Sequence, residues 1–142
     1  MSPLEKRAWL SICSMFPPYL VYFAVQIASP GLFSTMLERI GFLAAIATVH
    51  ALAYIGGLLV FRHGERSERV LEDDRDHAID ARATRVAYFV MLTALILVGV
   101  VMPFDAGGWE ITNAALFYIV LTETIRDALI IHGYRRGPRL AH

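Results

Sequence analysis

Long apolar stretches dominate the chain, and short polar connections separate them. They cover about residues 8–28, 40–61, 84–104 and 111–133. A bilayer core about 30 Å thick needs about 20 predominantly apolar residues in helical form, so each stretch is long enough to cross it. The pattern predicts an all-α polytopic membrane protein, in which residues 1–142 form a single membrane domain with the architecture of a four-transmembrane-helix bundle.

The first apolar stretch follows Lys6 and Arg7, as the apolar part of a secretory signal peptide does. However, Pro17 and Pro18 interrupt it, and Gln26 stands where a cleavage site requires a small residue. We therefore interpret this stretch as a membrane span that is kinked at the two prolines. Such a kink frees backbone carbonyls, which neighbouring helices or side chains must satisfy.

Basic residues gather in the connections on one side of the predicted bundle. Lys6 and Arg7 precede the first span, six arginines lie in 62–85, and three arginines follow the fourth span. The other two connections contain only Arg39. Because cytoplasmic connections carry an excess of Lys and Arg, both termini and the charged segment 62–83 are expected in the cytoplasm. We expect a multi-pass protein of the bacterial inner, or plasma, membrane.

Composition agrees with a lipid environment and narrows the function. Hydrophobic residues make up 56% of the chain and charged residues 18%, with a mean hydropathy of +0.51. Soluble domains contain about 25% charged residues. The formal net charge is zero, which argues against a nucleic-acid partner. Cys13 is the only cysteine, so an intramolecular disulfide, a CxxC redox pair and a thiolate zinc site are excluded.

Charged side chains interrupt the fourth apolar stretch, where lipid would make them costly. Glu123 lies 12 residues before Arg135, or about 18 Å along a helix, which predicts a position near the bilayer midplane. Arg126 and Asp127 lie one turn nearer the cytoplasm. In the second stretch His50 lies 12 residues before Arg62, so a similar depth is expected, with Tyr54 one turn away on the same face.

Two interpretations of these polar residues stay open. In the first they form a structural network, in which Glu123 pairs with Arg126 or Asp127 pairs with a basic side chain, and His50 donates a hydrogen bond across helices. In the second Glu123 and His50 form a proton- or cation-binding site, because burial opposes the charged form of both groups. Ionised groups inside a bilayer are expected to face protein or water in either case.

Small residues recur in the second apolar stretch. Gly41, Ala45, Ala53 and Gly57 follow a spacing that lets helices approach closely in membranes. The pattern alone does not say which helix would approach.

The charged segment contains an amphipathic start to the third span. Acidic residues come first and arginines follow, as the dipole at a helix N-terminus favours, so we expect a helix from Asp73 to Arg85 with Asp73 or Asp74 as its N-cap. Four potential ligands share one face of this helix. They form a candidate site for a divalent cation, and the alternative is a solvated acidic face paired with arginines. The candidate ligands are Asp73, Asp76, His77 and Asp80. The charged functional candidates of the segment are Asp73, Asp74, Arg75, Asp76, His77, Asp80, Arg82 and Arg85.

The stretch "EDDRDHAIDARATRVAY" resembles the D-E-R-D-x-x-I-x-x-x-x-x-R-x-x-Y signature of an uncharacterised family of small four-span prokaryotic integral membrane proteins. The closing "TETIRDALIIHGYRRG" is similar to the last helix and the Y-R-R-G end of that family. The likeness covers residues from about 65 to 137, and Asp74 stands where the family usually has Glu. It implies the fold and the membrane placement, and it implies neither a catalytic residue nor a substrate.

Three classes of function differ in what they require of the polar residues. A non-enzymatic regulatory or accessory module would form a homo-oligomer, most simply a dimer, and contact a cytoplasmic protein partner through its charged segment. A small proton-coupled transporter would use Glu123 and His50. An enzyme is not expected, because HExxH, a GxSxG elbow and a phosphate-cradling loop are absent from the sequence. No cofactor is expected, and the lipid bilayer is the one partner common to all three.

Overall fold

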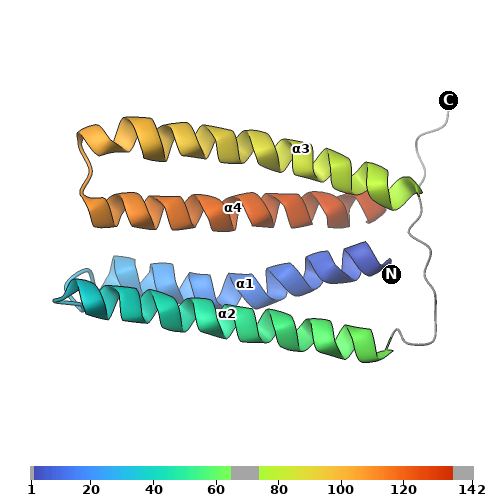
Figure 1. Ribbon diagram of the computed structural model, residues 1–142, viewed down its shortest axis with the longest axis horizontal. Helices are drawn as coiled ribbons and strands as arrows, with labels where there is room; N and C mark the ends of the chain where they lie inside the picture. The colour runs from blue at the N-terminus through green and yellow to red at the C-terminus, as the bar shows by residue number, and fades with distance from the viewer. Residues whose placement is uncertain (1, 65–73, 136–142) are drawn as a thin grey trace. The chain divides into compact units, whose positions relative to one another are not determined.

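A computed structural model describes residues 2–64 and 74–135, and the regular elements in this part of the chain are all helices (Figure 1). The chain divides into two compact units. Unit 1 comprises residues 1–8 and 71–142, and unit 2 comprises residues 9–70. Helix α1 (Pro3–Ala28) contributes to both units. The all-helical prediction is confirmed for the described residues.

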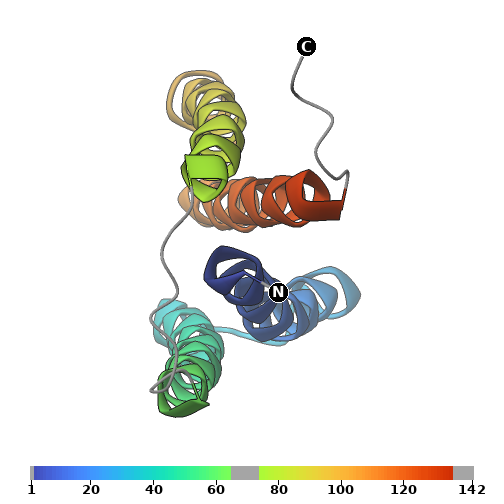
Figure 2. The same cartoon turned by 90° about the vertical axis from the view of Figure 1, so that its right-hand side faces the viewer.

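Unit 2 pairs the main part of α1 with α2 (Met36–Gly64). Helix α1 continues through Pro17 and Pro18, although neither residue has an N–H to donate to the preceding turn. Aromatic rings join the two helices near their connection: Phe42 stacks on Tyr22 at 5.6 Å and on Phe33 at 5.0 Å between ring centroids. The two helices run side by side in both views of the chain (Figure 2).

A reciprocal capping box begins α2. The Glu38 N–H donates to Thr35 Oγ1 at 3.3 Å, and the Thr35 N–H donates to Glu38 Oε2 at 3.1 Å. The Ser34 N–H donates to the same carboxylate oxygen at 2.8 Å. These backbone hydrogen bonds, led by the one from Thr35, lower the pKa of Glu38.

Small residues of α2 divide between two faces. An added Cβ at Gly57 would collide with the Leu10 side chain of α1, so this glycine lets the two helices approach closely. By contrast, Gly41 and Gly56 have open space where a Cβ would stand. Among the described residues of unit 2, Gly57 therefore serves the α1–α2 contact, and Gly41 and Gly56 do not.

In unit 1, a long helix descends from the charged segment and α4 returns beside it. Helix α3 (Asp74–Ile96) continues into a π-helical turn, η1 (Leu97–Val101), and a 3-10 turn, η2 (Met102–Phe104). Pro103 has no N–H to donate to the Gly99 carbonyl. One residue earlier, the Met102 N–H donates to the Leu97 carbonyl, five residues back, as in a π-helix. After a short turn, α4 (Gly108–Arg135) runs antiparallel to α3 (Figure 1).

Alanines allow α3 and α4 to pack closely. Ala83, Ala87 and Ala94 of α3 are buried, at spacings that keep them on one side of the helix. Near the end of the pair, an added Cβ at Gly133 would stand 2.9 Å from Ile79 Cγ2, so a larger residue there would displace the Ile79 side chain or the helix that carries it. The predicted helix from Asp73 to Arg85 is confirmed from Asp74 onward and is continuous with the third apolar stretch.

Three helices are long and apolar enough to cross a membrane: Pro3–Ala28, Met36–His63 and Asp74–Phe104. Helix α4 is 28 residues long, and Glu123, Arg126 and Asp127 interrupt its apolar sequence. The fold is therefore that of an all-helical chain with three helices suited to a membrane. The fourth span stays a prediction.

Candidate functional site

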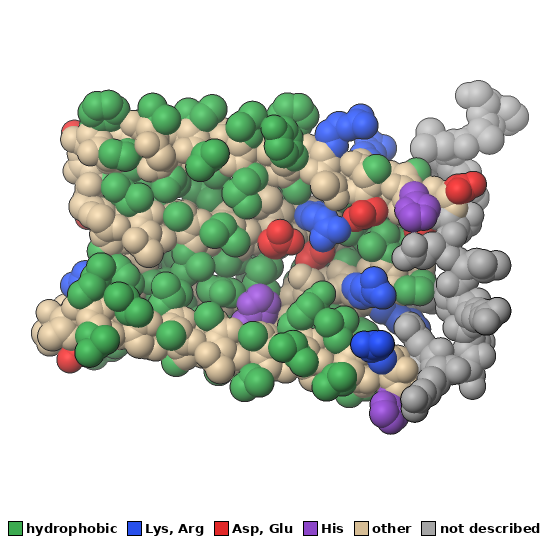
Figure 3. All heavy atoms as spheres, viewed as in Figure 1, with side chains coloured by type: hydrophobic (Ala, Val, Ile, Leu, Met, Phe, Trp, Pro, Cys, Tyr) green, Lys and Arg blue, Asp and Glu red, His purple; other side chains and the backbone are tan. Residues whose placement is uncertain are grey.

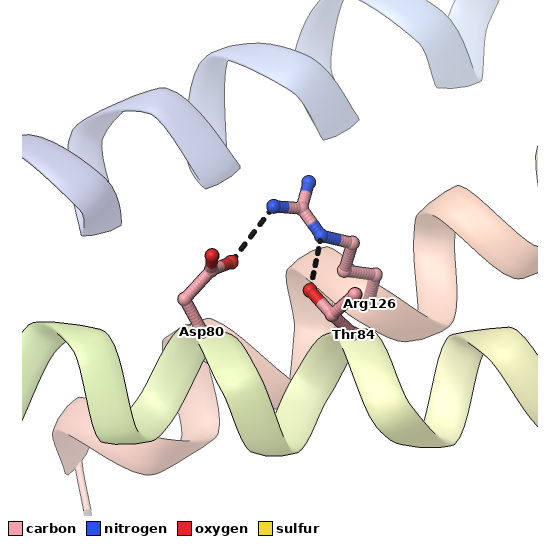
Figure 4. A network of polar contacts seen from close by, with 3 residues as sticks. All are labelled: Asp80, Thr84 and Arg126. Atoms are coloured by element: carbon pink, nitrogen blue, oxygen red, sulfur yellow. Dashed lines mark hydrogen bonds and ion pairs between the residues drawn. The ribbon is translucent and has the colours of Figure 1, made fainter.

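The main polar contact between α3 and α4 joins Arg126 to Asp80. Arg126 Nη2 donates to Asp80 Oδ1 at 2.7 Å, and Arg126 Nε donates to Thr84 Oγ1 at 3.3 Å. Figure 4 shows the guanidinium reaching from α4 to both side chains, which lie one turn apart on α3. Arg126 therefore pairs with an acidic residue of the charged segment rather than with Glu123. We name this group, Asp80, Thr84 and Arg126, the latch.

A second polar contact closes the end of the same helix pair. The Tyr134 hydroxyl of α4 donates to Asp76 Oδ1 of α3. The Arg75 guanidinium carbon lies 5.7 Å from the centre of the Tyr134 ring, within the range of a cation–π interaction. Burial and the hydrogen bond to Asp76 together raise the pKa of Tyr134 to about 12. The hydroxyl therefore stays a donor throughout the physiological pH range.

These contacts fix which residues of α3 and α4 lie at the same level. Asp76 meets Tyr134, and Ile79 meets Gly133. The latch continues this antiparallel register toward the turn. By the same register, the backbone of Arg126 lies roughly level with residue 85, and that of Glu123 lies about 4.5 Å farther toward the turn, near residue 88.

The other two charged residues of α4 differ in burial. Asp127 is buried, with 3% of its surface exposed, whereas Glu123 is half-buried. Within the described part of unit 1, Glu123 forms no hydrogen bond or ion pair. One residue before Glu123, the buried Thr122 hydroxyl also has no hydrogen-bond partner there. Among the polar residues of α4 from Thr122 to Asp127, only Arg126 belongs to the latch.

His50 lies in unit 2, among aromatic residues. Its ring meets the Tyr19 ring of α1 edge-on at 5.5 Å and lies 6.5 Å from the Tyr54 ring of α2, between ring centroids. His50 and Tyr54 lie close together, as expected. The contact with Tyr19 was not predicted, because nothing in the sequence sets the register of α1 against α2. Glu123 belongs to the other unit, so its pairing with His50 stays a prediction.

The metal candidate has no assembled site in the described residues. There, no group of three or more His, Cys, Asp and Glu side chains is placed to hold a metal ion. Asp73, one of the four candidate ligands, lies outside the described residues. Asp76 and Asp80 are instead engaged with Tyr134 and Arg126 across the helix pair.

The charged residues of the segment divide between contacts with α4 and exposed positions. Asp76 and Asp80 turn toward α4, as their contacts show. Arg82 and Arg85 are exposed, as are Asp74 and His77 at the start of the helix. Figure 3 shows acidic and basic side chains gathered between α3 and α4, and further basic side chains on the outer side of α3. Asp76 and Asp80 thus hold α3 to α4, and Arg82 and Arg85 are left for other contacts.

Comparison with known proteins adds no identity: no protein-family model, curated protein or solved structure matches this chain. The resemblance of residues from about 65 to 137 to a four-span prokaryotic family stays a prediction.

Proposed function

We propose that α4 is a fourth membrane span and that both termini lie in the cytoplasm of a prokaryotic cell, at its inner membrane. A helix of 28 residues is about 42 Å long, which exceeds a bilayer core of about 30 Å. Arg126, the cation that interrupts its apolar sequence, is paired by the latch, which lowers the cost of inserting it. The distribution of Lys and Arg supports the orientation.

The register of α3 and α4 supports a shallower position for the α4 charges than counting along the sequence did. If the core spans residues 85–104 of α3, a length of about 28 Å, Arg126 lies at its cytoplasmic edge and Glu123 about 4.5 Å inside. A long arginine side chain reaches outward from such a depth easily. This position weakens the argument that Glu123 and His50 share the bilayer midplane.

We propose further that the protein is a non-enzymatic regulatory or accessory module that acts through its charged segment. The observation that carries this proposal is the latch, together with the Asp76–Tyr134 contact. Both tie the cytoplasmic turns of α3 to α4, so that these turns form a fixed extension of the membrane helices. A fixed, exposed helix end suits recognition by a protein partner.

The module is proposed to be a homodimer. Gly41 and Gly56 of α2 leave open space on an apolar helix, and small residues of this kind permit close helix packing in lipid. A second copy would use that space. Strictly monomeric mass in both mild detergent and lipid nanodiscs would contradict this part of the proposal.

Photo-crosslinking in native membranes tests the module. Ala78 and Ala81 are exposed on the cytoplasmic turns of α3, so a photoreactive residue at either position is expected to capture one discrete protein partner. The matched control is Leu92, which is exposed on the same helix about 16 Å from Ala81 and is expected to capture lipid only. The Asp80→Asn/Arg126→Gln variant, which removes the latch, is expected to weaken capture from both positions.

The transporter alternative predicts the opposite pattern. Protein reconstituted in liposomes with an interior pH dye would then move protons when a second solute is supplied, and Glu123→Gln would abolish the movement. Such coupled movement, together with an absence of protein capture at Ala78 and Ala81, would refute the module and favour the transporter.

A further inference from the structure

The outer side of α3 carries a continuous stripe that changes from basic to apolar. Arg82, Arg85, Phe89, Leu92 and Ile96 follow one another at spacings of three or four residues, which keeps them on one face of the helix. This face lies away from the buried Ala83 and Ala87: Arg85 is about 180° from their midpoint, and Arg82 about 120°. The stripe is therefore turned away from α4.

The apolar part of the stripe identifies its surroundings as lipid. Phe89 is 60% exposed, Leu92 40% and Ile96 52%, and all three lie on a helix apolar enough to cross a membrane. Exposed apolar side chains on such a helix are stable in contact with acyl chains. The apolar part of the stripe therefore begins at Phe89, one to two turns beyond the arginines.

The depth of the arginines matches the layer of phospholipid headgroups. Residues 85–104 extend over about 28 Å, close to the thickness of the hydrocarbon core. Arg85 then lies at the boundary of the core, and Arg82 lies about 4.5 Å outside it. Lipid phosphates occupy this layer, and an arginine guanidinium binds phosphate oxygens with two parallel N–H donors.

No acidic residue of α3 lies one turn before or after Arg82 or Arg85. Positions three and four residues before and after Arg82 and Arg85 hold no Asp or Glu. No hydrogen bond or ion pair within the described residues engages either guanidinium, whereas Asp76 and Asp80 are engaged with α4. Figure 3 shows basic side chains on the outer side of α3 beside the apolar side chains that continue along it.

We propose that Arg82 and Arg85 form a binding site for the phosphate of an anionic membrane lipid, whose acyl chains lie against Phe89 and Leu92. Charge complementarity selects an anionic over a zwitterionic lipid, and the adjoining lipid-facing stripe selects a lipid over a soluble anion. The proposal rests on the membrane placement of α3 and on no cytoplasmic partner, so it can fail while the proposed module stands.

Lipid binding to the purified full-length protein tests the site. In mild detergent, native mass spectrometry compares retention of phosphatidylglycerol with that of phosphatidylcholine. Each basic residue near an anionic surface contributes about fivefold to binding, so Arg82→Gln/Arg85→Gln is expected to reduce the preference for phosphatidylglycerol by up to about thirtyfold. Arg82→Lys/Arg85→Lys keeps both charges and is expected to keep most of the preference. If the double glutamine variant does not fold, the single variants are measured, with about fivefold expected for each.

The matched control is Arg39→Gln/Arg62→Gln, which removes the same net charge at other positions and is expected to keep the preference. An equal loss in this control would show a general charge effect and overturn the site. An unchanged preference in Arg82→Gln/Arg85→Gln would overturn it as well. Displacement of phosphatidylglycerol by millimolar inorganic phosphate would assign the arginines to a soluble anion and would also contradict the proposal.

Discussion

Removing the latch is expected to destabilise the α3–α4 pair by a measurable and modest amount. Two unit charges about 4 Å apart interact by about 4 kcal/mol at an effective dielectric constant of 20. However, the side chains of Arg126 and Asp80 are 33% and 40% exposed, so solvent screens much of this energy. Exposed ion pairs contribute about 0.2–1 kcal/mol, and the short distance of 2.7 Å favours the upper end of that range.

A double-mutant cycle of Asp80→Asn and Arg126→Gln isolates this energy. We expect a coupling of about 1 kcal/mol between the two positions. The single variant Arg126→Gln is expected to cost more than Asp80→Asn, because it also removes the bond to Thr84, a contact of about 0.5–1.5 kcal/mol. The measurement is reversible unfolding in mixed micelles with increasing dodecyl sulfate, followed by circular dichroism.

The control cycle combines Arg126→Gln with Asp74→Asn. Asp74 is an exposed acidic residue at the start of the same helix and has no contact with Arg126 in the described structure, so the two changes are expected to add. Independent sites add to within about 0.3–0.5 kcal/mol. A coupling below about 0.3 kcal/mol for Asp80 and Arg126, or an equal coupling in the control, would refute the reasoning.

Three further predictions follow from the helix ends. Tyr134→Phe removes the hydrogen bond to Asp76 and is expected to abolish the tyrosinate absorbance that titrates near pH 12. Because the pKa of Tyr134 is raised on folding, the stability that its hydroxyl contributes is present below about pH 10 and is lost as the pH rises through 12. Glu38→Ala removes the capping box at Thr35. Because the pKa of Glu38 is lowered on folding, the parent protein is expected to lose stability as the pH falls below about 4.5. Thermal unfolding between pH 6 and 3 measures this loss, and the variant is expected to lack it. Ala78→Pro places a proline inside α3 and is expected to cost about 3 kcal/mol in the same unfolding assay, and a variant as stable as the parent would show that this segment is not helical in solution.

Local patterns in the sequence were sufficient to predict the helices. Apolar stretches of about 20 residues and the charge order from Asp74 to Arg85 are properties of single segments, and these predicted α3 well. Pro17 and Pro18 were also visible in the first apolar stretch, and α1 continues through both residues, while the kink stays a prediction.

Partners across helices could not be predicted in the same way. Asp80 had been grouped with acidic residues of its own helix face as a metal candidate, whereas its contact is Arg126, 46 residues away. That pairing depends on the register that the η1 and η2 turns impose on α3 and α4. Likewise, the hydrogen bond of Tyr134 to Asp76 follows from the close approach of α3 and α4 that Gly133 permits.

The central claim is that α3 and α4 cross the membrane as a pair, with the latched charged segment on the cytoplasmic side. Cysteine labelling in a Cys13→Ala background tests it most directly, because Asp105 and Ala81 are exposed at opposite ends of the pair. In intact spheroplasts, a membrane-impermeant maleimide is expected to label Asp105→Cys, and to label Ala81→Cys only after permeabilisation. Labelling of Ala81→Cys in intact spheroplasts, with Asp105→Cys protected until permeabilisation, would contradict the account.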